Sequence, residues 1–233
     1  MKTTFKNKSE NKLRGKIQAW LISNQNDNEV HEVFVRDFLS YKKNLTPNAY
    51  LADLASLSRG LTVDMEIKYI ALSTAYDPPN KQSTLELEIA RIVPLSINQV
   101  NNKLIIEGKF DNTFFTKSTN IVSATDKKIF TVTSTAGLSI GDRFQVKISS
   151  NWEQRKIVNI ASNVITVHEN FTSIPTAGTD NAQQMISRLH LVYGSGATLS
   201  LNTGKACSLA QMITYKPSTF DAYTRHEIEF LGS

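Results

Sequence analysis

The segment Gly141-Asp-Arg-Phe-Gln-Val-Lys-Ile-Ser149 decides the fold class. Its apolar residues Phe144, Val146 and Ile148 alternate with polar ones, and a Gly-Asp pair comes immediately before them. Successive side chains of a β-strand point to opposite faces, so this pattern predicts a short strand with these three apolar side chains on one face. Short strands introduced by such turns are typical of small barrels.

The same pattern continues on both sides of this segment, over a compact unit from residue 120 to residue 180. Short alternating runs are separated by turns such as Ala161-Ser-Asn163, and Ser/Thr/Gly/Pro-rich stretches at 116–125 and 172–181 suit linkers. A unit of about sixty residues is only marginally stable alone. We therefore predict an inserted, small β-barrel-like subdomain that contacts a parent domain.

The first two predicted strands outside this unit, 13–23 and 30–39, are joined by the Asn/Asp cluster 24–28, which suits a hairpin loop. A helix over 13–22 is the alternative, because several apolar residues there also fall at helical spacing. Gly15 and the β-branched residues favour a strand.

Further apolar or alternating runs recur along the remainder of the chain. We predict that residues 13–119 and 181–233 form the main domain, which makes the chain mainly β: an antiparallel β-sandwich with one short helix and the inserted subdomain. The predicted strands are 67–72, 85–89, 103–110, 185–193, 206–215 and 223–230.

The one predicted helix follows Thr46-Pro47, an N-cap residue followed by proline at the first helical position. Gly60 supplies its end. We expect its apolar stripe to pack against a sheet. The stripe consists of Tyr50, Leu51, Leu54 and Leu57.

The formal net charge of +5 is concentrated at the start of the chain, and the rest is balanced. The basic residues form a candidate interaction site within or next to an N-terminal arm, residues 1–12, that could bind an acidic neighbouring subunit or, less plausibly, nucleic acid. A solvated terminus is the alternative. These residues are Lys2, Lys6, Lys8, Lys12, Arg14 and Lys16.

Cysteine and hydropathy restrict the class of protein further. Cys207 is the only cysteine, so the chain has no internal disulfide and no zinc site built from several thiolates. No apolar run approaches the ~18 residues of a transmembrane helix, and no signal-peptide core follows the basic start. We expect a soluble protein of a reducing compartment with no membrane partner.

The sequence predicts no catalytic, metal or cofactor site. Glu86 and Glu88 share one face at strand spacing, where a solvated edge or a pair with Arg91 is expected rather than an acid/base pair. Gly194-Ser-Gly196 lacks the spacing of a nucleophile elbow or phosphate loop and is interpreted as a turn. The four histidines stand far apart, at positions expected to be polar or intermediate in strands.

Four segments, in this order, resemble a group of tailed-bacteriophage virion proteins, over most of residues 12–118 and 185–231. Two departures are Ser73-Thr-Ala-Tyr-Asp77, in place of a glycine-rich turn, and the unit 120–180, in place of a Glu-x-Gly-Leu segment. The segments are Arg36-Asp-Phe-Leu39 before the helix, Lys68-Tyr-Ile-Ala-Leu72 before a proline turn, Glu86-Leu-Glu-Ile-Ala-Arg91, and Val192-Tyr-Gly-Ser-Gly-Ala-Thr198 with Thr203-Gly204 and Lys216.

The resemblance implies a non-enzymatic virion protein of the tail, neck or baseplate, assembled in the host cytoplasm as a symmetric homo-oligomer. Its partners would be other phage virion proteins, and the basic arm would dock on an acidic subunit. The alternative is a receptor- or glycan-binding module of a phage fibre, with Trp152 of the inserted unit on its binding face. A cell-wall hydrolase is a third hypothesis, for which no catalytic constellation was found.

Overall fold

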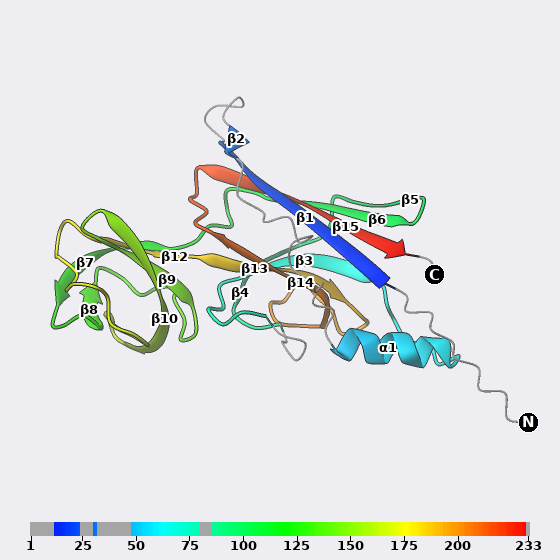
Figure 1. Ribbon diagram of the computed structural model, residues 1–233, viewed down its shortest axis with the longest axis horizontal. Helices are drawn as coiled ribbons and strands as arrows, with labels where there is room; N and C mark the ends of the chain where they lie inside the picture. The colour runs from blue at the N-terminus through cyan, green and yellow to red at the C-terminus, as the bar shows by residue number, and fades with distance from the viewer. Residues whose placement is uncertain (1–11, 24–29, 32–47, 80–84, 232–233) are drawn as a thin grey trace, which may run out of the picture.

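The computed structural model describes residues 12–23, 30–31, 48–79 and 85–231 of the 233-residue chain. Within these ranges the protein is mainly β, all strand pairs are antiparallel, and one helix is present. Figure 1 shows two sheets side by side with a separate barrel at one end of the molecule. The predicted fold class is confirmed.

One layer of the main domain is a five-stranded sheet in the order β2-β1-β15-β6-β5. β1 pairs along its whole length with β15, so the strand prediction for its residues is confirmed and the helical alternative is wrong. Residues 32–39 of the second predicted strand lie outside the described residues. The strands are β1 (Lys12–Ser23), β2 (Val30–His31), β5 (Ser96–Val100), β6 (Lys103–Phe110) and β15 (Phe220–Leu231).

The other layer is a four-stranded sheet in the order β14-β13-β3-β4. Apolar side chains from both sheets form one core, which includes Ile106 and Phe110 of the first sheet and Leu189 and Leu191 of the second. This shared core makes the main domain a β-sandwich. The strands are β3 (Ile67–Ser73), β4 (Glu88–Ile92), β13 (Ile186–Tyr193) and β14 (Lys205–Thr214).

Six strands close into the barrel in the order β10-β11-β8-β7-β12-β9. Phe144, Val146 and Ile148 are buried in its core, as their alternation predicts. On the opposite face of this strand, Gln145 is only 8% exposed and donates to Gln183 Oε1 at 2.8 Å. The strands are β7 (Ser118–Ala124), β8 (Ile129–Val132), β9 (Arg143–Ile148), β10 (Asn151–Ala161), β11 (Val164–Val167) and β12 (Asn181–Gln184).

The barrel extends beyond the predicted unit 120–180 at both ends, because β7 begins at Ser118 and β12 ends at Gln184. Only Met185 separates β12 from β13 of the sandwich. One nearly continuous extended segment therefore serves both parts, and a composition change cannot mark the boundary between them.

Buried polar contacts join the barrel to the sandwich. Thr74 Oγ1, just after β3 of the sandwich, donates to Asp142 Oδ1 of the barrel at 2.5 Å, and Gln184 Nε2 of the barrel strand β12 holds the same carboxylate by donating to Oδ2 at 2.7 Å. Arg143 reaches the carbonyl of Tyr76 at 2.5 Å. Burial raises the pKa of Asp142. The two parts are held together by hydrogen bonds that are shielded from water, and such bonds are costly to break.

Helix α1 (Asn48–Ser58) ends as predicted at Gly60, which has a φ of +80°. The amide of Gly60 bonds to the carbonyl of Leu57, and the amide of Leu61 bonds to that of Ser56. These two hydrogen bonds form a Schellman motif, which favours glycine at the position with a left-handed backbone conformation, here Gly60. Thr46-Pro47 lies outside the described residues.

The apolar stripe of α1 packs against the sandwich only in part. The ring of Tyr50 meets that of Tyr193 edge-on, with 5.1 Å between centroids. Leu51 and Leu57 remain 43% and 48% exposed, so the prediction that the whole stripe packs against a sheet is wrong for these two residues. These two side chains lie beside the face of α1 that contacts the sandwich. The spacing of apolar residues along a helix does not give the width of that face.

Candidate interaction sites

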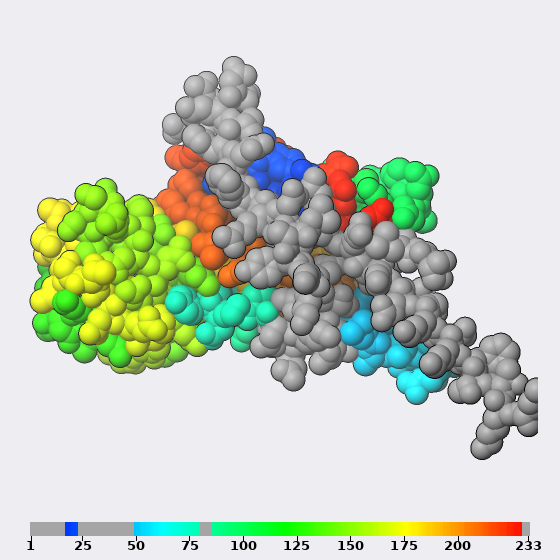
Figure 2. All heavy atoms as spheres, viewed as in Figure 1, coloured from blue at the N-terminus to red at the C-terminus, as the bar shows by residue number. Residues whose placement is uncertain are grey.

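Strand β5 forms one edge of the five-stranded sheet. It pairs with β6 on one side, and no other described strand pairs with its second side. Since hydrogen bonds alternate in direction along an antiparallel pair, such an edge presents N–H and C=O groups away from its neighbour. Figure 2 shows the hairpin of β5 and β6, in green, at the margin of the molecule.

Apolar side chains gather at this edge. Val93, Leu95, Ile97 and Val100 are 61%, 68%, 46% and 51% exposed. Residues 93–100, called the β5 edge below, contain no charged side chain. Monomeric proteins protect edge strands with lysines, other charges or bulges, so an edge of this composition is a candidate surface for pairing with another chain.

The sequence prediction missed this strand, although a signal for it was present. Asn101 and Asn102 form a two-residue connection to β6, and Asn101 has a φ of +54°. A two-residue Asn pair between runs containing Val and Ile is a strong hairpin signal. Five polar residues among Ser96 to Asn102 conceal it, because β5 lacks the regular apolar alternation of a core strand.

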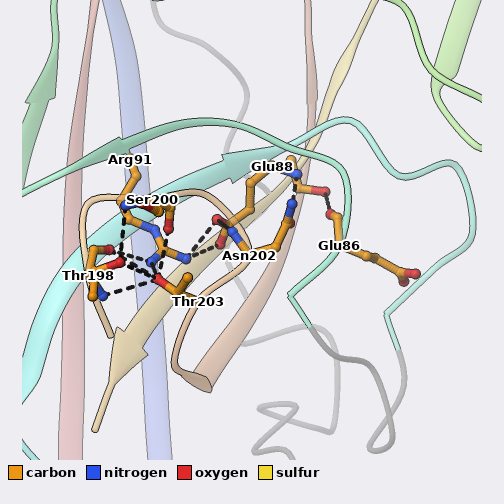
Figure 3. A network of polar contacts seen from close by, with 8 residues as sticks. Glu86, Glu88, Arg91, Thr198, Ser200, Asn202 and Thr203 are labelled. Atoms are coloured by element: carbon orange, nitrogen blue, oxygen red, sulfur yellow. Dashed lines mark hydrogen bonds and ion pairs between the residues drawn. The ribbon is translucent and has the colours of Figure 1, made fainter. Parts of the chain in front are cut away.

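A second candidate region is the loop 194–204 between β13 and β14, which is attached to the sandwich by a buried ion pair (Figure 3). Arg91 Nη2 lies 2.9 Å and 2.7 Å from the two carboxylate oxygens of Glu88, and both side chains have no exposed surface. The predicted pair with Arg91 is confirmed, whereas a solvated position is wrong for Glu88.

The ion pair also bonds directly to the loop. Arg91 Nη1 donates to the carbonyl of Thr198 at 2.6 Å and to Thr203 Oγ1 at 2.8 Å, and the amide of Asn202 donates to Glu88 Oε2 at 2.5 Å. Both terminal nitrogens of Arg91 and both carboxylate oxygens of Glu88 are thus used inside the protein. The arrangement positions a loop that exposes Leu199 and Leu201, and it offers no accessible acid or base.

Glu86 does not share a strand face with Glu88, so that part of the prediction is wrong. β4 begins only at Glu88, and the left-handed φ of +51° at Leu87 interrupts the extended chain before it. Glu86 instead accepts from Arg188 Nη1 at 3.0 Å, with its side chain 52% exposed. The two carboxylates therefore have separate structural partners.

The histidines do not assemble a site. His190 and His226 are fully buried, contrary to the polar or intermediate positions expected for them, and burial lowers the pKa of each to about 3. Neither ring is hydrogen-bonded to any part of the chain that the structure describes. In the same ranges, no three His, Cys, Asp or Glu side chains gather as metal ligands.

An open cavity of about 400 Å³ lies where the barrel meets the sandwich. Its charged side chains are already paired: Lys156 with Asp77 at 2.5 Å, and Glu86 with Arg188. Among the described residues that line the cavity, each of the three acidic or basic side chains therefore has a salt-bridge partner. Its lining comprises Ala75, Tyr76, Asp77, Leu85, Glu86, Leu87, Ile140, Gly141, Lys156 and Asn202.

The predicted interaction residues fall in three places. Lys2, Lys6 and Lys8 lie outside the described residues, so their role stays a prediction. Trp152 lies near the start of β10 and is 42% exposed on the barrel surface. The backbones of the other three, Lys12, Arg14 and Lys16, belong to β1 and pair with β15, so these residues are part of the sheet rather than of a free arm.

The register of β1 places Lys16 opposite Glu227 and Arg14 opposite Glu229. Two basic positions near the N-terminus are therefore opposite acidic positions of the same chain in the strand register.

No protein-family model, curated protein or solved structure matches this chain. The described ranges also contain no helix with the length and apolar character needed to cross a membrane.

Proposed function

We propose that this chain is a structural virion protein of a tailed bacteriophage, in the tail, neck or baseplate, that acts by homo-oligomeric assembly and docking to other virion proteins. The phage assignment is carried by the resemblance of the four ordered sequence segments. The assembly role is carried by one structural observation, the uncharged and apolar β5 edge. A surface of this kind becomes stable when a second chain covers it.

The polar groups support a mechanical rather than a chemical role. A fully buried ion pair, Glu88 with Arg91, attaches a loop, and the hydrogen bond from Thr74 to Asp142 joins the sandwich to the barrel. These contacts use charged and polar side chains to make the molecule rigid. Rigid subunits lose little conformational entropy on association, which favours ordered assembly.

The proposal is tested on particles of the phage that encodes the chain. Mass spectrometry of purified, DNA-filled particles is expected to find the chain in a fixed copy number of at least two per particle. Its absence from washed particles, with abundant chain free in the lysate, would refute the virion assignment.

A second function, glycan or receptor binding by a fibre, is favoured by the exposed indole of Trp152. An exposed aromatic ring offers a flat apolar surface against which a sugar ring can stack. A glycan array with the intact chain tests it: binding that is lost in Trp152→Ala would support this function, and absence of binding to every glycan would remove it for the ligands on the array.

A further inference from the structure

We propose that the β5 edge pairs antiparallel with the β5 edge of a second copy, about a two-fold axis that passes beside Asn98. The inference rests on the proposed function and specifies its partner: another copy of this chain. Pairing would join two five-stranded sheets into one continuous sheet.

The composition of the β5 edge is compatible with pairing to the same edge of a second copy. With the axis at Asn98, this residue faces the partner's Asn98, and Ser96 faces the partner's Val100. No charge stands opposite a like charge, which is the arrangement that would oppose self-pairing. Ile97 and Val100, about half exposed in the single chain, would be covered by the added strand.

The charges on the neighbouring strand β6 add complementarity. β6 places Lys103 beside Val100 and Glu107 beside Ser96. The two-fold axis reverses this order in the second copy, so the row that begins with Lys103 ends with the partner's Glu107. The other row begins with Glu107 and ends with the partner's Lys103. Each row thus has one basic and one acidic residue at its two ends, with Glu107 also paired with Arg225 Nη1 at 2.8 Å, so the β6 charges place no like charges opposite each other.

The edge strand β14 fits a second copy less well. β14 borders the second sheet, but α1 lies beside it, and Asp53 of the helix bonds to Lys205 Nζ of that strand at 2.8 Å. A helix next to an edge is one of the ways in which proteins block strand addition. β5 has no such cover among the elements that the structure describes.

The test is sedimentation velocity of the full chain over a concentration series, with charge variants at the axis. The unsubstituted chain is expected to dimerise. Asn98→Lys and Asn98→Glu each place like charges opposite each other, so each is expected to raise the dimer Kd about fivefold or more. An equimolar mixture of the two variants is expected to dimerise more tightly than either variant alone.

Ser96→Lys is the matched control, because it adds the same charge on the same face of the same strand but away from the axis. It is expected to change the Kd by less than Asn98→Lys. Circular dichroism and thermal melting of all variants separate a loss of pairing from a loss of folding. Recovery of the dimer in the mixture of Asn98→Lys and Asn98→Glu would show independently that the variants lose pairing and not folding.

Three results would overturn the inference: an unsubstituted chain that stays monomeric at all concentrations, equal effects of Asn98→Lys and Ser96→Lys, or a mixture that dimerises no better than its components. A chain found in particles with β5 unpaired would overturn the inference and leave the proposed virion role intact. A chain that dimerises through β5 but is absent from particles would support the inference and overturn the proposed virion role.

Discussion

Replacing Glu88 by glutamine tests whether the buried ion pair holds the loop 194–204. The substitution keeps the size of the side chain and removes the charge that faces Arg91, whose guanidinium has no exposed surface. Breaking a buried pair by neutralising one partner costs about 3–5 kcal/mol, because the other charge stays buried without compensation. For a protein of this size, that loss lowers the Tm by roughly 6–20 °C.

The measurement is urea unfolding followed by circular dichroism, with thermal melts in parallel. Glu107→Gln is the matched control, since Glu107 pairs with Arg225 at 2.8 Å and the two side chains are 41% and 33% exposed. Exposed pairs are worth about 0–1 kcal/mol, so the control is expected to change little.

The double variant Glu88→Leu with Arg91→Met removes both charges. It is expected to be more stable than Glu88→Gln, because no charge is left buried alone. A cost below about 1 kcal/mol for Glu88→Gln, equal to that of the Glu107 control, would refute the argument that the buried pair holds the loop.

Three further outcomes are expected. Since burial lowers the pKa of His190 and His226 to about 3, the unfolded chain takes up protons first as the pH falls below 6.5, and each histidine is expected to remove about 1.4 kcal/mol per pH unit down to about pH 3. Urea unfolding at pH 7.5, 6 and 5 measures this slope, and a slope unchanged by His190→Gln would contradict it. Gly108→Val is expected to destabilise the sandwich by about 1–3 kcal/mol, as even a Cβ there lies 2.5 Å from Ile70 Cδ1; an unchanged melt would count against this packing. Phe144→Ala is expected to cost about 3–5 kcal/mol in the barrel core, whereas the exposed Trp152→Ala is expected to stay within about 0.5 kcal/mol, and equal effects in denaturant titrations would contradict the burial of Phe144.

The sequence predicted the strands whose apolar residues alternate and face a single core. Phe144, Val146 and Ile148 show this in the barrel, and Gly60 shows that a local signal places a helix end correctly. Such features depend on neighbours in the chain, so the pattern contains the information needed to predict them.

Features that depend on distant segments were not predictable. β13 is buried on both faces, because the opposite sheet covers one and Ala197 of the loop 194–204 packs with Val192 on the other. His190 lies in this strand and is therefore buried rather than half-exposed. The break at Leu87, which separates Glu86 from Glu88, has no glycine or proline to announce it.

The candidate site was predictable only in part. The exposure of Trp152 agrees with a surface role, but the β5 edge was missed because an edge strand lacks the continuous apolar face of a core strand. A sequence pattern indicates which residues are expected to be buried within the folded chain. It does not report which strand ends up without a second neighbour.

A cryo-electron microscopy reconstruction of the phage particle tests the assembly role most directly. The expected result is density for several symmetry-related copies of the sandwich with its attached barrel, in the tail, neck or baseplate, with the β5 edge covered by another chain. A particle without this density, or copies in which the β5 edge faces solvent throughout, would contradict the account.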